Sequence, residues 1–275
     1  MEGNGFHTGV PNRLRVTAGA PGRGVARIGS RTHVVWGAQG GEAQSADRCT
    51  SVAGIGPLEH LSAAAIALGV RGWELEADHE DLPLFDGSAG PWAKALRSLG
   101  SPATVDVREC GLQSHSWEGT QRGSLEIEPS DHFELLVEWS FGPSGPELWH
   151  GDASDLEEIL PARTFIDADQ WWRAKSGGLL RGAGLDSGRL FAGKGPLPPQ
   201  CLRTLEEEGV DTDGNIWTGG AQRVPMECAA HKALDLVGDI GCAIGYLPAI
   251  RILARDAGHA LHAELCRALR AAHRD

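Results

Sequence analysis

The stretch AIALGVRGWELEAD at residues 65–78 is the strongest indication of the fold, because its pattern returns as GCAIGYLPAIRILAR at residues 241–255. Each stretch is typical of the end of a helix, a glycine, a short connector and then a strand. In both halves of the chain, strand-like runs come before this unit and a second helical segment follows it. The repeat predicts an α+β protein of two pseudo-symmetric domains, each a β-sheet with two helices.

The other elements follow from alternation, helical periodicity and turn residues. Strands are expected at residues 13–18, 24–29, 32–36, 73–78, 124–128, 133–139 and 250–255, and helices at 57–69, 91–99, 167–175, 227–245 and 259–272. We expect an N-terminal domain over 1–106 and a C-terminal domain over 107–275, with a linker near 103–112. A single α/β domain is the alternative, but the strands do not alternate regularly with helices. The segment 186–226 is the least regular and is expected as an insert, and such long loops are usually functional or mobile.

The composition limits the partners of the chain. Its 275 residues carry 25 Lys and Arg against 37 Asp and Glu, a net charge of −12, which argues against nucleic acid because phosphates need a basic surface. No run reaches the roughly 18 apolar residues of a transmembrane segment, and no signal peptide opens the sequence. The six cysteines form no C-x-x-C pair, so we expect free thiols in a reducing compartment, the cytoplasm. A monomer is the expected state.

The segment HKALDLVGD, residues 231–239, combines an apolar face with a narrow polar side. His231 and Asp235 are four residues apart and therefore lie one turn apart on the same face of a helix. An imidazole nitrogen and a carboxylate oxygen are both ligands of zinc, and a catalytic zinc site needs a third protein ligand from elsewhere. The alternative is a His–Asp hydrogen bond on a partly buried helix, which this segment alone does not exclude.

Two further segments carry histidines in unusual places. Glu59 and His60 begin a helix that is otherwise almost wholly apolar. A carboxylate is favourable in a first helical turn but a protonated histidine is not, so His60 fits better as a neutral metal ligand. The adjacent Glu59 is a candidate general base of a zinc hydrolase. His259 opens the last helix and is a candidate donor to an oxyanion, held by a carboxylate such as Asp239.

Together these segments resemble the zinc-dependent UDP-3-O-acyl-N-acetylglucosamine deacetylases of lipid A biosynthesis. The motifs occur in the order of the family and span nearly the whole chain. They are G-x-G-x-H-[ST]-G at 3–9, R-x-T-T within DRCTS at 47–51, V-E-H-L-x-A-A at 58–64, D-G-S-A-x-P-[FW] at 86–92, A-R-T-F at 162–165, H-K-x-L-D-x-x-G-D at 231–239 and G-H-x-L at 258–261. The nine-residue motif, with Glu-His upstream and Gly-His downstream, is highly specific.

The resemblance implies two α+β domains packed helix layer to helix layer, with the active site between them. It also implies that zinc activates water against the N-acetyl group of an acylated UDP-amino sugar, releasing acetate and the free amine. The site residues that it implies are the zinc ligands His60, His231 and Asp235, the general base Glu59, the oxyanion partners Thr164 and Lys232, and the electrostatic or acid partner His259 with its carboxylate Asp239.

The chain departs from the family pattern at Pro57, Ile166, Ser187, Ala230 and His262. The region after residue 186, which in the family forms the hydrophobic passage for the acyl chain, is longer here. His262 and His273 are expected as surface histidines. Two alternatives stay open: a diverged zinc amidohydrolase acting on another N-acylated sugar, and a non-catalytic binding protein on the same scaffold. Equal activity on the non-acylated sugar nucleotide would favour the first, and a purified protein without zinc the second.

Overall fold

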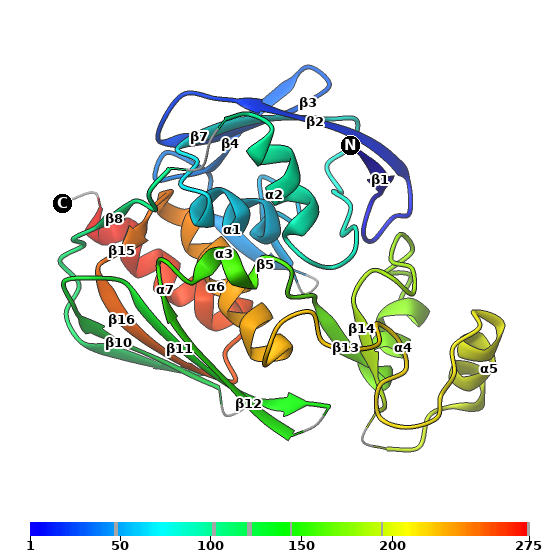
Figure 1. Ribbon diagram of the computed structural model, residues 1–275. Coiled ribbons are helices and arrows are strands. Elements are labelled where there is room, and N and C mark those ends of the chain that lie inside the picture. Colours follow the sequence, from blue (N-terminus) through cyan, green and yellow to red (C-terminus); the bar gives the residue numbers. More distant parts are fainter. Residues whose placement is uncertain (47–48, 101–102, 120–122, 144, 194, 274–275) are drawn as a thin grey trace.

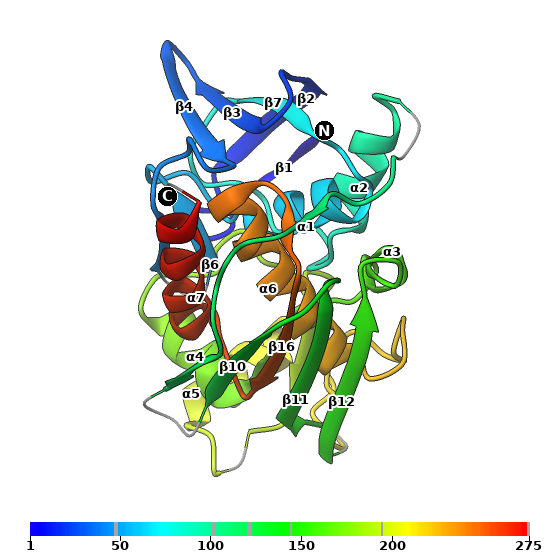
Figure 2. The same cartoon turned by 90° about the vertical axis from the view of Figure 1, so that its left-hand side faces the viewer.

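Two five-stranded sheets with helices between them make up the protein (Figure 1). The computed structural model describes residues 1–46, 49–100, 103–119, 123–143, 145–193 and 195–273. In the view turned by 90°, one sheet lies above the helices and the other below them, so the helix layers of the two halves face each other (Figure 2). This arrangement confirms the expected α+β architecture with its helix layers in contact.

The first sheet has the strand order β1-β2-β7-β3-β4. Its central strand β7 pairs in parallel with β3 and antiparallel with β2. The helices α1 and α2 pack on it, and β5 and β6 form a separate antiparallel pair. The bounds are β1 (Glu2–Asn4), β2 (Pro11–Ala18), β3 (Arg23–Ile28), β4 (Arg31–Trp36), β5 (Ala43–Ala46), β6 (Cys49–Val52), α1 (Glu59–Ala67), β7 (Gly72–Ala77) and α2 (Gly90–Arg97).

The second sheet repeats this topology with the order β12-β11-β16-β10-β9. Its central strand β16 pairs in parallel with β11 and antiparallel with β10. In each sheet the central strand follows the longest buried helix of its half, so the expected pseudo-symmetry is confirmed. The bounds are β9 (His115–Glu118), β10 (Ser124–Pro129), β11 (Glu134–Gly142), β12 (Gly145–Asp152), α6 (Glu227–Ile244), β16 (Ile250–Arg255) and α7 (His259–Ala272).

A short parallel pair lies where the linker is expected. It consists of β8 (Val107–Arg108) and β15 (Leu247–Pro248). The segment therefore belongs to the second half through its hydrogen bonds to the strand that follows α6. The division of the chain at residues 106 and 107 stays a prediction.

The helix α6 lies at the centre of the molecule. All its residues except Lys232 are buried, including the polar side that the sequence distinguished from the apolar face. The nine residues of α1 are buried as well. A helix enclosed on every side is expected to be apolar all round, so ionisable side chains on both helices need a partner or a function.

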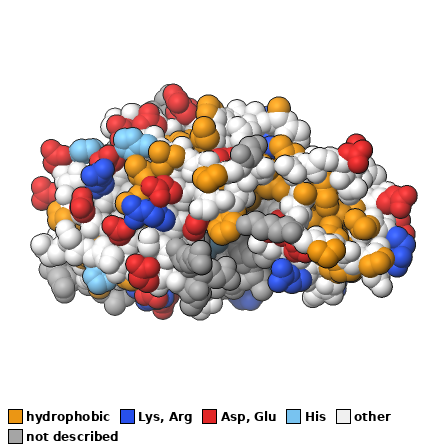
Figure 3. All heavy atoms as spheres, turned by 90° about the horizontal axis from the view of Figure 1, so that it is seen from below, with side chains coloured by type: hydrophobic (Ala, Val, Ile, Leu, Met, Phe, Trp, Pro, Cys, Tyr) orange, Lys and Arg blue, Asp and Glu red, His pale blue; other side chains and the backbone are white. Residues whose placement is uncertain are grey.

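Most of the segment between β12 and α6 forms an appendage around a second, smaller core, which also includes Phe6 and Leu84 of the first half. The expectation of an irregular 186–226 region is partly wrong, because it contains β14 and α5. The α5 helix is short and buries only two of its residues, Cys201 and Leu205. The bounds are α3 (Leu156–Ile159), β13 (Phe165–Asp167), α4 (Ala168–Ser176), β14 (Arg189–Phe191) and α5 (Pro199–Glu207). Hydrophobic side chains gather on the surface over the α4 and α5 part of the molecule (Figure 3).

Three smaller expectations have different outcomes. The helix predicted from Pro57 begins at Glu59, with Leu58 as its N-cap, and the Leu58 N–H donates to the Thr50 carbonyl of β6 at 3.0 Å. The six cysteines are not joined in disulfides, and five of them are buried. Across the described ranges, no helix is both long and apolar enough to cross a membrane.

Candidate metal centre

Three buried side chains from α1 and α6 meet at one point between the two halves. The donor atoms of His60, His231 and Asp235 all lie within 4.8 Å of one another. Asp235 Oδ1 lies 3.7 Å from His60 Nε2 and 3.3 Å from His231 Nε2. The structure thus places His60 of α1 beside the pair on α6, as the third ligand that the α6 segment alone could not supply.

Close packing of α1 against α6 makes this meeting possible. Gly238 faces the start of α1, where an added Cβ would lie 2.8 Å from the Glu59 carbonyl carbon and closer still to its oxygen. One turn further along α1, the Ser62 hydroxyl donates to the Gly238 carbonyl at 2.6 Å and accepts from Trp36 Nε1 at 3.0 Å. A glycine and a buried hydrogen bond therefore hold the Glu59-His60 pair against the His231–Asp239 segment.

Burial and hydrogen bonding prepare His231 and Asp235 as ligands. Burial lowers the pKa of His231 to about 3, so its imidazole is neutral near pH 7. Its Nδ1 donates to the Ala162 carbonyl at 3.1 Å, which leaves Nε2 facing Asp235 as an acceptor. Burial raises the pKa of Asp235, but the ammonium group of Lys232 outweighs it and holds this pKa well below its usual range. The group therefore presents neutral imidazole and ionised carboxylate, the protonation states that bind metals.

Lys232, expected beside an oxyanion, bonds to the ligand group itself. Its Nζ donates to Asp235 Oδ2 at 2.8 Å. The ammonium also lies 5.4 Å from the ring centre of Trp139 and 5.3 Å from that of Phe165. Two aromatic faces and one carboxylate thus hold this charge near the ligands.

Glu59 lies beside the ligands at the start of α1. The carboxylate is buried, and its Oε2 accepts the Thr50 N–H at 3.0 Å. Burial raises the pKa of Glu59, and the positive charge of His259 opposes this rise. A buried carboxylate whose pKa moves towards neutrality has the property of a general base.

Asp239 organises a second cluster on the same side of α6. Its Oδ2 accepts from His259 Nδ1 at 2.8 Å and from His262 Nδ1 at 2.7 Å, and its Oδ1 accepts the Thr50 hydroxyl at 2.5 Å. Burial raises the pKa of Asp239, but the charge of His259 and the imidazole hydrogen bonds bring it to about 2. Burial would lower the pKa of His259, but Asp239 raises it to about 9, so this imidazole is protonated near pH 7.

The expectation that His262 is a surface residue is wrong. Its side chain is buried, and burial holds its pKa below the usual value. His259 and His262 are three residues apart on α7, so both imidazoles reach the one carboxylate of Asp239. His273 is exposed, as expected.

Thr164 comes directly after Arg163, which belongs to a network of buried charged side chains. The hydrogen bonds of Thr164 itself are made by its backbone and involve Gly87 and Arg189. Its N–H donates to the Gly87 carbonyl at 2.6 Å, and its carbonyl accepts the Arg189 N–H at 2.9 Å. The ring of Phe165, the next residue, lies 6.2 Å from that of His231. The place of the Thr164 hydroxyl at an oxyanion stays a prediction.

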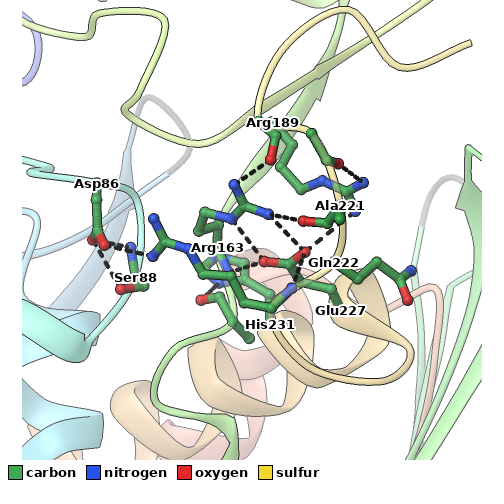
Figure 4. A network of polar contacts seen from close by, with 12 residues as sticks. Asp86, Ser88, Arg163, Arg189, Ala221, Gln222, Glu227 and His231 are labelled. Atoms are coloured by element: carbon green, nitrogen blue, oxygen red, sulfur yellow. Dashed lines mark hydrogen bonds and ion pairs between the residues drawn. The ribbon is translucent and has the colours of Figure 1, made fainter.

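Figure 4 shows the network, in which the carboxylate of Glu227 lies between the guanidinium groups of Arg163 and Arg189. Glu227 is fully buried in the first turn of α6, one turn before His231. Its Oε1 accepts from Arg163 Nε at 2.8 Å, and its Oε2 lies 3.3 Å from Arg189 Nη1. Arg223 continues the network to Asp86 of the D-G-S-A segment at 2.5 Å.

Comparison with known proteins places the chain in a family. A model of the family described as UDP-3-O-acyl N-acetylglycosamine deacetylase matches residues 1–211 and 205–271. The chain belongs to this family. The match covers both sheet-and-helix units and both of the helices that supply the candidate ligands.

The curated relatives share a name with the family and extend over the same length. The UDP-3-O-acyl-N-acetylglucosamine deacetylase of Trichormus variabilis is 28% identical over 96% of this chain and 92% of the relative. That of Phenylobacterium zucineum is 28% identical over 98% of this chain and 89% of the relative. That of Solibacter usitatus is 26% identical over 96% and 85% respectively. The deacetylase family membership therefore concerns the whole molecule and not a single motif.

The structure gathers seven of the eight expected site residues in one region, all but Thr164, and their functional roles stay predictions. His60, His231 and Lys232 all lie next to Asp235. Asp239 and His259 form the adjacent cluster. Residues 47 and 48 of the R-x-T-T match lie outside the described residues, but Thr50 of the same stretch bonds both Glu59 and Asp239.

Sequence reasoning missed His262, Glu227 and the bridging role of Thr50. The spacing of His259 and His262 on one helix face was the available signal for the first. An acidic residue at the start of a helix is common, so its position did not mark Glu227 as a site residue. Only the fold, which places Arg163 beside it, showed its place in the charged network.

Proposed function

We propose that this chain hydrolyses the N-acetyl group of a UDP-3-O-acyl-N-acetylglucosamine and releases acetate and the free amine for lipid A biosynthesis. One observation carries the proposal: in a chain of this deacetylase family, a buried two-histidine, one-carboxylate group lies beside the buried carboxylate of Glu59. The family relationship supports the substrate class, and the site geometry supports amide hydrolysis.

Zinc is the metal that we assign to His60, His231 and Asp235. Tetrahedral bonds of about 2.0–2.1 Å to nitrogen or oxygen place ligand atoms roughly 3.3 Å apart. The separations from Asp235 Oδ1 are 3.3 Å to His231 Nε2 and 3.7 Å to His60 Nε2, so the donor set fits. When bound, zinc lowers the pKa of a coordinated water towards about 7 and polarises a carbonyl oxygen.

Glu59 is the general base in this proposal. As the water oxygen forms a bond to the acetyl carbon, Glu59 takes the proton and the carbonyl electrons move to oxygen. The Thr50 N–H on Oε2 holds the carboxylate in place during this transfer. When the C–N bond breaks, the amine leaves with a proton from Glu59 or from His259. Acetate and the free amino sugar then balance the atoms of amide and water.

His259 supplies positive charge to the developing oxyanion. Asp239 holds its Nδ1, so its Nε2 is the atom that can turn towards the reacting group, and this atom lies 3.9 Å from Asp235 Oδ2. Lys232 uses one donor on Asp235, and an ammonium has three, so further donors are available to the oxyanion. We assign Thr164 to the same oxyanion on the family resemblance. One well-placed donor contributes about 3 kcal/mol to such a transition state.

The acyl chain of the substrate is proposed to contact the appendage between β12 and α6. Apolar side chains gather over its α4 and α5 (Figure 3), and Leu202 and Ile216 expose 44% and 38% of their surface. We propose that the protein acts as a monomer in the cytoplasm on this small-molecule substrate.

The test measures zinc content together with acetate release from the 3-O-acyl sugar nucleotide. We expect about one zinc per chain and activity that depends on the acyl group, so the non-acylated nucleotide serves as the matched control. Glu59→Gln keeps the shape of the side chain, and loss of a general base lowers the rate by about 100- to 10,000-fold. Zinc content should stay unchanged in this variant. A Glu59→Gln protein with the wild-type rate would contradict the mechanism.

A further inference from the structure

One peptide group is held at both ends by two side chains of the same helix. The peptide between Ala162 and Arg163 offers its N–H to Glu227 Oε1 at 3.1 Å and its carbonyl to His231 Nδ1 at 3.1 Å. Glu227 and His231 are four residues apart on α6 and therefore lie one turn apart on the same face. The hydrogen bond that orients the imidazole of His231 thus ends on a peptide that Glu227 holds in place.

Glu227 binds this peptide in more than one way. Its two oxygens accept from Arg163 Nε at 2.8 Å and from Arg163 Nη2 at 3.1 Å, in addition to the backbone N–H. The same guanidinium donates to the Gly219 and Ala221 carbonyls at 2.6 and 2.8 Å. Figure 4 shows these bonds converging above the position of His231. The peptide is therefore tied to the helix through both the main chain and the side chain of Arg163.

We propose that Glu227 is a positioning residue of the metal centre, which sets the orientation and the tautomer of His231 by holding the Ala162–Arg163 peptide. The inference rests on the proposed metal site. A histidine ligand presents one nitrogen correctly only when its other nitrogen has a fixed partner. Here that partner is a backbone carbonyl, and its position depends on Glu227.

A second buried glutamate at the same helix end provides a matched control. Glu147 Oε2 accepts from the N–H groups of Cys228 and Ala229 at 2.8 and 3.1 Å, and the side chain is buried. It satisfies free donors of the helix start but bonds neither atom of the Ala162–Arg163 peptide. Loss of Glu147 should therefore weaken the helix end without disturbing His231.

The experiment compares Glu227→Gln, Glu227→Asp and Glu147→Gln with the wild type. Glu227→Asp keeps the charge between the two arginines but withdraws the carboxylate by one methylene, so it remains informative where Glu227→Gln does not fold. Zinc affinity is measured on metal-free protein by competition with a chelator. The tautomer of His231 is measured by nitrogen NMR on metal-free protein, and kcat and KM are measured separately.

In folded Glu227 variants we expect zinc affinity to fall by about 10- to 100-fold, as for other residues that orient metal ligands. The His231 Nδ1–H form should cease to be the single tautomer, and kcat should fall while KM stays. Glu147→Gln should lose thermal stability but keep all three properties.

Wild-type zinc affinity and tautomer in folded Glu227→Asp would overturn the inference. An equal loss of affinity in Glu147→Gln would also overturn it, because the effect would then belong to the helix end in general. The tautomer needs neither zinc nor substrate. A wild type that releases no acetate would therefore refute the proposed function while this measurement still decides the role of Glu227.

Discussion

Gly238 is the residue whose substitution should separate the two halves of the metal centre. In Gly238→Ala, the new Cβ would lie 2.8 Å from the Glu59 carbonyl carbon and 2.9 Å from its Cα, whereas ordinary contacts are 3.4–4 Å. Both atoms belong to the backbone of a buried helix and cannot turn away. The start of α1 must therefore move away from α6.

The size of that movement follows from the contacts. Relief of the overlap requires roughly 1 Å of separation, and overpacking of this kind costs about 1–3 kcal/mol of folding free energy. The distance of 3.7 Å between His60 Nε2 and Asp235 Oδ1 joins the same two helices, so it widens with them. A misplacement of about 1 Å in a reacting site costs on the order of 100-fold in rate.

The assay is zinc competition on metal-free protein, with urea unfolding as a second measurement. We expect Gly238→Ala to remain folded, to lose at least about tenfold in zinc affinity and to lose most activity. Gly258→Ala is the control, because an added Cβ there meets no atom within 4 Å although the residue adjoins His259. Wild-type zinc affinity in Gly238→Ala would refute the close-packing argument.

Three further outcomes are expected. His262→Leu removes a donor from the buried carboxylate of Asp239 and should cost about 2 kcal/mol, or roughly 4–8 °C in thermal unfolding, whereas His262→Asn keeps a donor and should cost less than half of that; equal stability of the two variants would contradict the hydrogen bond. Chelation should lower the melting temperature, and zinc at a hundredfold excess over its Kd should restore about 2.7 kcal/mol; a melting temperature unaffected by chelator would count against a structural contribution of the metal. Burial raises the pKa of Glu227, but its bonds to Arg163 hold it below the ordinary 4.5, so its stabilising contribution is full above that pH and is lost as the pH falls through the lower folded value. The free energy of unfolding, measured from pH 7 to pH 3, should therefore fall less steeply in Glu227→Gln than in the wild type. An unchanged slope would show that this carboxylate is not the group that titrates.

Periodic segments were predictable because their signal is local. The helices that carry His60 and His231, and the central strands that follow them, appear in the residue pattern within one or two positions. The edge strands β1, β9 and β12 were not expected, because exposed edge strands lack a run of apolar residues. The helix α5 was missed for a related reason, since only Cys201 and Leu205 mark its buried side.

The candidate site divides in the same way. Side chains that share a helix face can be read from their spacing, so the residue pattern was enough to select His231 with Asp235 and the adjacent pair Glu59-His60. The tertiary structure alone decided which carboxylate His262 meets, and it also decided that Thr50 bridges Glu59 to Asp239. It decided as well that the peptide between Ala162 and Arg163 lies between two residues of α6. The reason is physical: spacing along a helix follows from its 3.6-residue period, whereas partners from different elements depend on how closely the two helix layers pack.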